Sequence, residues 1–133
     1  MGSAVSNAMP GETQAFIATE QVDGRIPVVS VMGEVDMATA PAFEQTLLDA
    51  ADSGTDQVIV DLSACSYFDY TGLKVLLATR RHLDPMNRRL SVVMSNPNML
   101  EIFRITGFDR RFEIHPSLKS ALNGHGHVNG DGP

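Results

Sequence analysis

A nearly continuous apolar run, Val58-Ile59-Val60-Asp61-Leu62, lies near the middle of the chain. Strands with such runs are typical of parallel sheets that are covered on both faces. The run is much shorter than the roughly 18 apolar residues that a membrane-spanning helix needs. The sequence therefore predicts a central strand of an α/β domain, and 133 residues fit one such domain.

Two further strands are predicted before this run, at Ala15–Val22 and Ile26–Gly33. They are joined at Asp23-Gly24, a dipeptide typical of tight hairpin turns. Both faces of the second strand are mostly apolar, which predicts that other elements cover it on both sides. Pro27 lacks a backbone N–H, so it fits the start of a strand or an edge strand.

Helical spacing of apolar residues alternates with strands in the rest of the chain. This pattern predicts helices that begin near Ala40, Thr71, Pro97 and Pro116, and strands at 58–62, 90–94 and 112–114. The order ββαβαβαβα implies a mixed sheet with parallel strands joined by right-handed crossovers. We therefore predict a single α/β domain over residues 14–122. Residues 1–13 and 123–133 are rich in Gly, Ser, Asn and Pro, which predicts flexible tails.

The charge of the chain is acidic and unevenly distributed. The net charge of −6 argues against a nucleic-acid binder, which needs a basic face. Residues 1–69 contain 11 acidic side chains and one basic side chain, Arg25, whereas residues 70–133 contain 9 basic and 5 acidic side chains. This distribution indicates either two differently solvated faces or an acidic surface that steers a basic partner protein.

The sequence contains no phosphate-binding loop, nucleophile elbow or zinc-protease motif, so we expect a protein that is not an enzyme and uses no metal or cofactor. Cys65 is the only cysteine and cannot form an internal disulfide. We interpret it as a small buried residue, with a redox switch as the alternative. The single cysteine and the absence of a secretory signal predict a cytoplasmic protein without a membrane anchor.

Two loops stand out as candidate sites, at residues 33–41 and 68–73, because each joins a predicted strand to a predicted helix. If the two strands are parallel neighbours, both loops emerge at the edge where open α/β sheets place their sites. Asp69 and Thr71 lie where the second helix begins. There they could help to bind an anion, or they could simply cap the helix.

Three motifs of this chain, taken together, are characteristic. They are the stretch from Val60-Asp61-Leu62-Ser63 to Phe68-Asp69-Tyr70-Thr71-Gly72-Leu73, the loop Gly33-Glu34-Val35-Asp36, and Phe103-Arg104-Ile105-Thr106-Gly107-Phe108. In this order they resemble the central motif, the Gly-Glu-Leu-Asp loop and the end of the third helix of STAS domains of the bacterial anti-sigma factor antagonist type. The resemblance covers about residues 14–122 and implies a mixed sheet with helices mainly on one face.

The resemblance implies a binding protein. Such antagonists bind an anti-sigma factor, usually a kinase of the histidine-kinase-like ATPase superfamily, and thereby release a sigma factor. It also implies that the two loops form the partner surface, with the residues Glu34, Asp36, Thr39, Asp69, Tyr70, Thr71 and Gly72. The alternative is a STAS module that acts as a nucleotide or small-ligand sensor, or as a scaffold subunit.

The sequence departs from the family at the phosphate-acceptor position. In the family the kinase phosphorylates a serine that directly follows the central aspartate, but here Tyr70 follows Asp69. A phenol hydroxyl lies roughly 4 Å farther from the backbone than a serine hydroxyl, so a kinase site shaped for serine misplaces it. Thr71 is then the candidate acceptor. Without phosphorylation, we expect control by abundance or by another signal such as oxidation of Cys65.

Overall fold

The computed structural model describes residues 3–5, 15–53 and 55–123. These residues form a six-stranded sheet whose spatial order equals the order in the sequence. The strands are β1 (Ser3–Val5), β2 (Ala15–Val22), β3 (Ile26–Val35), β4 (Gln57–Phe68), β5 (Arg89–Val93) and β6 (Glu113–His115). Strand β2 pairs antiparallel with both β1 and β3, and β3 to β6 run parallel to one another. The predicted order ββαβαβαβα is confirmed from β2 onward.

Within the predicted tail over residues 1–13, Ser3–Val5 pairs with β2 as strand β1. Other residues of that segment lie outside the described part of the chain. The same holds for 124–133 of the second predicted tail, whereas Asn123 ends the last helix.

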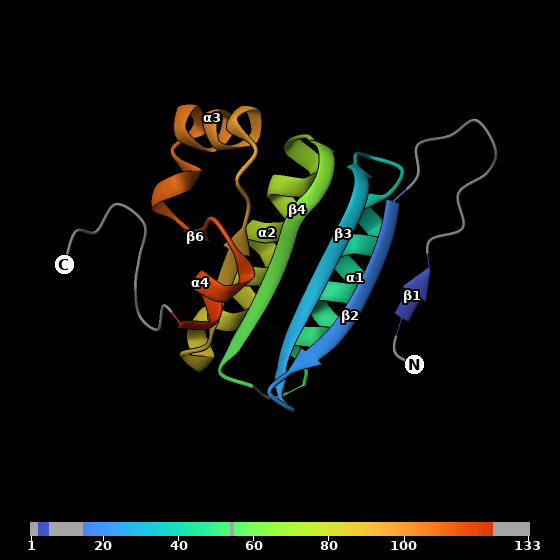
Figure 1. Cartoon of the computed structure of the whole chain (residues 1–133), viewed down its shortest axis with the longest axis vertical. Helices are drawn as coiled ribbons and strands as arrows, with labels where there is room; N and C mark the ends of the chain where they lie inside the picture. The colour runs from blue at the N-terminus through green and yellow to red at the C-terminus, as the bar shows by residue number, and fades with distance from the viewer. Residues whose placement is uncertain (1–2, 6–14, 54, 124–133) are drawn as a thin grey trace.

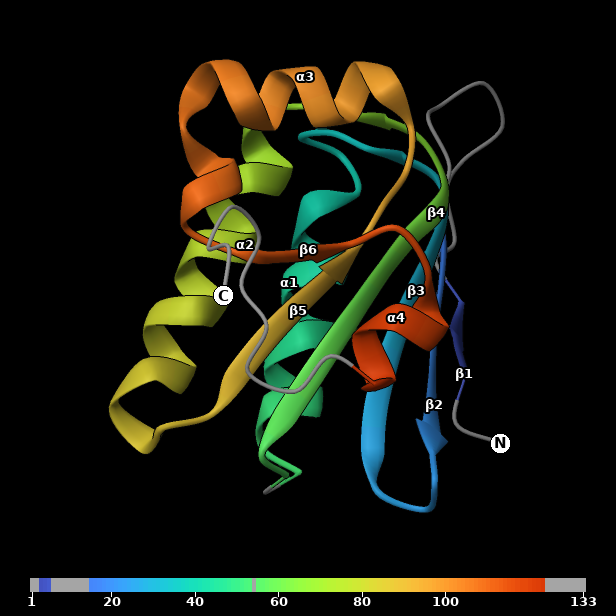
Figure 2. The ribbon, with the colours of Figure 1, turned by 60° about the vertical axis from the view of Figure 1, so that its left-hand side comes forward.

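The helices cover the two faces of the sheet unequally. They are α1 (Ala40–Ala51), α2 (Tyr70–Leu83), α3 (Pro97–Thr106) and α4 (Leu118–Asn123), with 3₁₀ turns η1 (Asp84–Met86) and η2 (Phe108–Arg110). Helices α1 and α2 pack on one face, α3 lies across the upper end, and the short α4 lies on the opposite face (Figures 1 and 2). The prediction that helices lie mainly on one face is confirmed.

The main core lies between the sheet and the helices α1, α2 and α3. Val58, Val60, Leu62 and Leu76 are all at most 1% exposed and belong to this one cluster. A chain of aromatic contacts runs through it, with 6.2 Å between successive ring centroids in the order Phe43, Phe68, Phe103 and Phe112. These rings come from α1, β4, α3 and the segment before β6, so they join the elements at the upper end of the sheet.

The opposite face has a smaller cluster beneath α4, formed by Val28, Ile59, Val93 and Ala121. The prediction that β3 is covered on both sides is therefore correct only near Val28. Met32, farther along the same face of β3, is 47% exposed, because a helix of six residues covers only part of the sheet.

The hairpin between β2 and β3 confirms the turn predicted at Asp23-Gly24. Both residues have positive φ angles, 55° and 75°, and the Arg25 N–H donates to the Val22 carbonyl at 3.1 Å. Pro27 is the second residue of β3, which agrees with the prediction of a strand start.

Candidate functional site

The parallel pairing of β3 with β4 brings the two predicted loops together. Val35 and Phe68, the last residues of these strands, are register partners. The Asp69 N–H then donates across to the Val35 carbonyl at 3.3 Å. The β3–α1 loop and the first turn of α2 therefore emerge side by side at the upper edge of the sheet (Figure 1).

The β3–α1 loop is fixed by hydrogen bonds from its own polar side chains. The Asp36 carboxylate accepts from the backbone N–H of Ala38 at 2.9 Å and of Thr39 at 3.2 Å. The Thr39 hydroxyl donates to the Glu34 carbonyl at 2.8 Å and accepts from the Asp36 N–H at 3.0 Å. Thr39 is only 3% exposed, so it supports the loop from below, whereas the Glu34 side chain is exposed.

Asp69 is the N-cap of α2. Its carboxylate accepts from the backbone N–H of Thr71 at 2.9 Å and from the Thr71 hydroxyl. The carboxylate satisfies a backbone donor that the first turn of a helix leaves without a partner, as a cap does. The hydroxyl of Thr71, the candidate phosphate acceptor, is therefore already bonded to a carboxylate.

Gly72 lies beneath this surface. It is buried, and a Cβ atom added to it would lie 2.6 Å from the Phe68 ring. Its absent side chain lets the first turn of α2 pack closely on that ring. Gly72 thus positions its exposed neighbours and presents no side chain to a partner.

Two large side chains project from this edge into solvent, Met37 at 78% exposure and Tyr70 at 66%. The Lys74 ammonium lies 5.8 Å from the centre of the Tyr70 ring, a distance typical of a cation–π contact. A groove of about 340 Å³ runs between α1 and α2, and its lining residues are Met37, Ala40, Pro41, Glu44, Thr71, Lys74, Val75 and Ala78. Sequence reasoning did not single out Met37 or Lys74, because neither periodicity nor motif distinguishes them.

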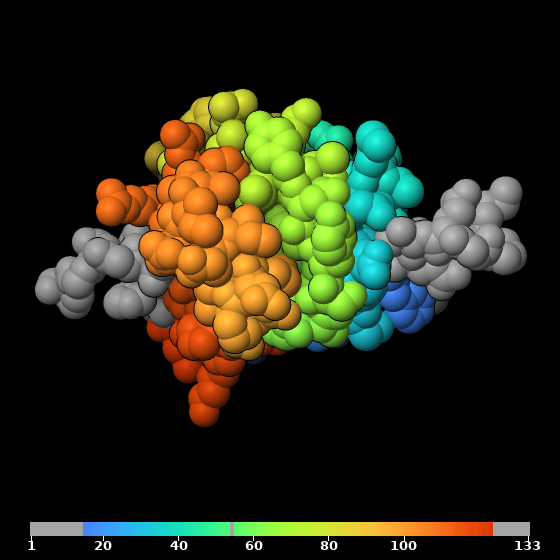
Figure 3. Space-filling view, turned by 90° about the horizontal axis from the view of Figure 1, so that it is seen from above, coloured from blue at the N-terminus to red at the C-terminus, as the bar shows by residue number. Residues whose placement is uncertain are grey.

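Helix α3 extends this surface. Seen from above, α3, the junction of β4 with α2, and the β3–α1 loop lie next to one another (Figure 3). Sequence periodicity predicted an apolar stripe on α3, but only Met99 and Phe103 of it are buried. Other apolar residues of the helix stay exposed, namely Leu100, Ile102 and Ile105. We call the combined surface of the β3–α1 loop, the first turn of α2 and α3 the loop face.

Cys65 lies in β4, three residues before the end of the strand, with 3% of its surface exposed. Its thiol donates to the Tyr67 carbonyl at 3.2 Å. Burial raises the pKa of the Cys65 thiol, which lowers the fraction of the reactive thiolate. These features agree with a structural residue and disfavour a redox switch.

Over the described ranges 3–5, 15–53 and 55–123, no group of His, Cys, Asp or Glu could hold a metal ion. In the same ranges, no helix is long and apolar enough to cross a membrane.

Residues 18–118 match the family described as "Mlab, STAS domain". The chain belongs to the STAS domain family. This STAS domain is similar to the anti-sigma-F factor antagonist RsfB of Mycobacterium tuberculosis, with 28% identity over 74% of this chain and 80% of the relative. It is 34% identical to an anti-sigma-B factor antagonist of Staphylococcus epidermidis, over 59% of this chain and 73% of the relative.

A solved structure agrees with this assignment. The crystal structure of an anti-sigma factor antagonist from Mycobacterium paratuberculosis has a TM-score of 0.77 and 33% identity, and the match covers 89% of this chain and 97% of the other. The STAS domain described here is therefore of the antagonist type, and the names of these relatives describe regulatory binding proteins.

Proposed function

We propose that this STAS domain is an anti-sigma factor antagonist that binds an anti-sigma factor through the loop face and thereby releases a sigma factor. The names of its relatives support the role. The observation that carries the assignment to this surface is the exposure of Met37 and Tyr70 on two neighbouring, internally bonded loops.

Physical reasons favour this surface for binding. Methionine and tyrosine are enriched at interfaces, and exposed tyrosines often contribute much of the binding energy. The hydrogen bonds of Asp36 and Asp69 fix the backbone beneath them, so little conformational entropy is lost on binding. The groove between α1 and α2 is large enough to receive an apolar side chain of the partner.

Binding can be tested with the anti-sigma factor that co-purifies from the source cell, identified by mass spectrometry. Calorimetry should show at least about tenfold weaker binding for Met37→Ala and for Tyr70→Ala, since truncating an interface hot spot typically costs about 2 kcal/mol or more and tenfold corresponds to about 1.4 kcal/mol. Met86→Ala is the matched control, because Met86 is 45% exposed in η1, beyond the opposite end of α2. Unchanged affinity in both loop variants would place the interface elsewhere.

We also propose that the usual kinase reaction does not occur at the acceptor position. Tyr70 holds its hydroxyl away from the backbone, and the Thr71 hydroxyl donates a hydrogen bond to the Asp69 carboxylate. A phosphate on Thr71 would add a charge of about −1.5 to −2 beside the Asp69 carboxylate and break this bond. The antagonist would then be controlled by its abundance or by another signal.

If the partner is a kinase, incubating this protein with the partner and ATP tests the second proposal. Mass spectrometry of the incubated protein should find no phosphate at residue 70 or 71, and Tyr70→Ser should become a substrate. Stoichiometric phosphate on Tyr70 would refute the proposal. Phosphate on Thr71 that disappears in Thr71→Ala would instead identify Thr71 as the regulatory acceptor.

A further inference from the structure

An arginine-lined groove of about 210 Å³ lies at the opposite end of α2 from the loop face. It is formed by the end of α2, the start of β5 and the segment from η2 to β6. Its charged lining comprises five arginines, namely Arg80, Arg88, Arg89, Arg110 and Arg111. Two carboxylates, Asp84 and Glu113, also line it, which leaves a surplus of three positive charges (5 − 2 = 3) in a protein of net charge −6.

The contacts within the groove show where the surplus lies. The Arg80 guanidinium pairs with Asp84 at 3.4 Å, and Arg89 donates two hydrogen bonds of 2.8 Å to Glu113. Arg88 donates to the backbone carbonyls of Ala51 and Thr55, which do not line the groove, so its charge is not neutralised by a carboxylate.

The other positive charges of the groove without a carboxylate partner belong to Arg110 and Arg111. Both are exposed, and neither forms an ion pair with any described residue. The Arg111 guanidinium lies 6.0 Å from the centre of the Phe108 ring. The guanidinium groups of these two adjacent arginines are therefore available to a ligand.

We propose that this groove binds the phosphate groups of a small molecule, of the size of a diphosphate. Guanidinium forks match phosphate oxygens in charge and geometry. Two linked phosphates carry roughly three negative charges near neutral pH, which equals the surplus. The small volume and the carboxylates of Asp84 and Glu113 in its lining disfavour an extended acidic peptide.

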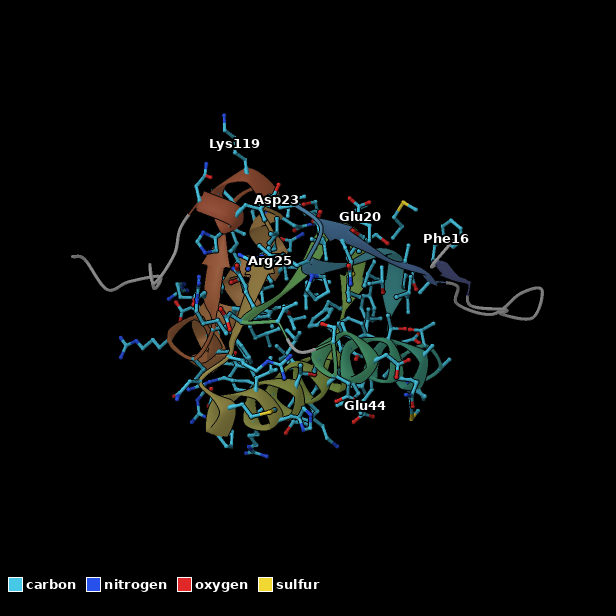
Figure 4. The ribbon with its side chains drawn as sticks, turned by 90° about the horizontal axis from the view of Figure 1, so that it is seen from below. Phe16, Glu20, Asp23, Arg25, Glu44 and Lys119 are labelled. Carbon is cyan, nitrogen blue, oxygen red and sulfur yellow. The ribbon has the colours of Figure 1, made fainter. Side chains whose placement is uncertain are left out.

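The site is independent of the proposed antagonist role. Helix α2 has 14 residues, so its ends are separated by about 21 Å at 1.5 Å per residue. A ligand in the arginine groove therefore leaves Tyr70 and the first turn of α2 accessible to a protein. The view from below places the labelled acidic residues Glu20, Asp23 and Glu44 on β2, its hairpin turn and α1, outside this groove (Figure 4).

Calorimetry of the full chain with inorganic pyrophosphate at low salt tests the site. We expect saturable binding that weakens at least about tenfold in Arg110→Ala and in Arg111→Ala, the usual effect of losing a charged hydrogen bond. The matched control is Arg81→Ala, because Arg81 is an exposed arginine of α2 that does not line the groove. This variant removes the same charge and should change the affinity less than about twofold. Urea unfolding of all variants should match the wild type, since Arg110 and Arg111 are exposed.

Three results would overturn the proposal. The first is the absence of saturable pyrophosphate binding at millimolar concentration. The second is an equal loss of affinity in Arg81→Ala, which would show attraction by net charge alone. The third is tighter binding of a short glutamate peptide than of pyrophosphate, which would identify an acidic protein segment as the partner.

Discussion

At the scale of single residues, the loop face depends on Gly72 and its contact with Phe68. A Cβ atom at position 72 would meet the Phe68 ring at 2.6 Å, and this ring is buried between Phe43 and Phe103. We predict that Gly72→Ala destabilises the fold by about 1–3 kcal/mol, the usual cost of overpacking a core. Urea unfolding measures this cost.

The double variant separates this contact from helix propensity. In the double variant Gly72→Ala with Phe68→Leu, the smaller side chain at position 68 leaves room for the new methyl group. The double variant should therefore lose less stability than the two single variants lose together. Strict additivity would show that Gly72 is needed for another reason.

The same residues show what sequence can predict at this scale. The role of Asp69 as a helix cap follows from its position before an apolar helical stripe, and the structure confirms it. The burial of Gly72 against Phe68 depends on the exact path of α2 over β4, which no local pattern specifies. Met37 is similar, because its exposure follows from the loop geometry that Asp36 and Thr39 fix.

At the scale of elements, β6 is attached to the sheet by an ion pair as well as by its short ladder. The Glu113 carboxylate accepts two hydrogen bonds from Arg89 of β5 and one from Ser91 at 3.2 Å. Burial raises the pKa of Glu113, but the hydrogen bonds and charge of Arg89 outweigh it, so the pKa lies below its ordinary value.

This lowered pKa predicts how stability depends on pH. A carboxyl whose pKa is depressed by folding stabilises the protein above its unfolded pKa, about 4.3 for Glu. That contribution is lost as the pH falls through the lower folded pKa. Urea unfolding between neutral pH and pH 3 should therefore show a wild-type advantage over Glu113→Gln that shrinks on acidification. Glu101→Gln is the control, because the Glu101–Arg104 pair is exposed on α3 and such surface pairs contribute little. An advantage of wild type over Glu113→Gln that is independent of pH would contradict the assignment.

The order of the elements was predictable because the spacing of apolar residues differs between strands and helices, and it changes at each boundary along the chain. The exceptions have physical causes. Strand β1 has three residues, too few to show any period, and it forms only by pairing with β2. The partial cover of β3 depends on the short length of α4, which its apolar pattern does not reveal.

At the scale of the whole molecule, the charge difference between the halves of the sequence becomes a difference in space. The strands lie in sequence order, so the described residues up to 69 build the side of the sheet with β1 to β4 and α1. Residues 70–123 build α2, β5, β6 and the arginine groove. Among the described residues, the first side has a charge balance of −9 (1 − 10) and the second of +5 (9 − 4). The sequence revealed the imbalance, but only the strand order places it on opposite sides.

This polarity predicts that association with a basic anti-sigma factor is steered by charge and is therefore slowed by salt. Raising the salt concentration from about 0.01 M to 0.15 M shortens the Debye length from about 30 Å to 8 Å, which screens long-range attraction. We expect the association rate constant, measured by stopped-flow fluorescence, to fall at least about tenfold, with a much smaller change in dissociation. Glu44→Gln with Asp49→Asn, two exposed changes on α1, should slow association at low salt and flatten the salt dependence. Asp84→Asn with Asp109→Asn removes the same charge from the basic side at residues that are not part of the loop face, and should not slow association. An association rate that does not change with salt would show that the acidic side serves solubility alone.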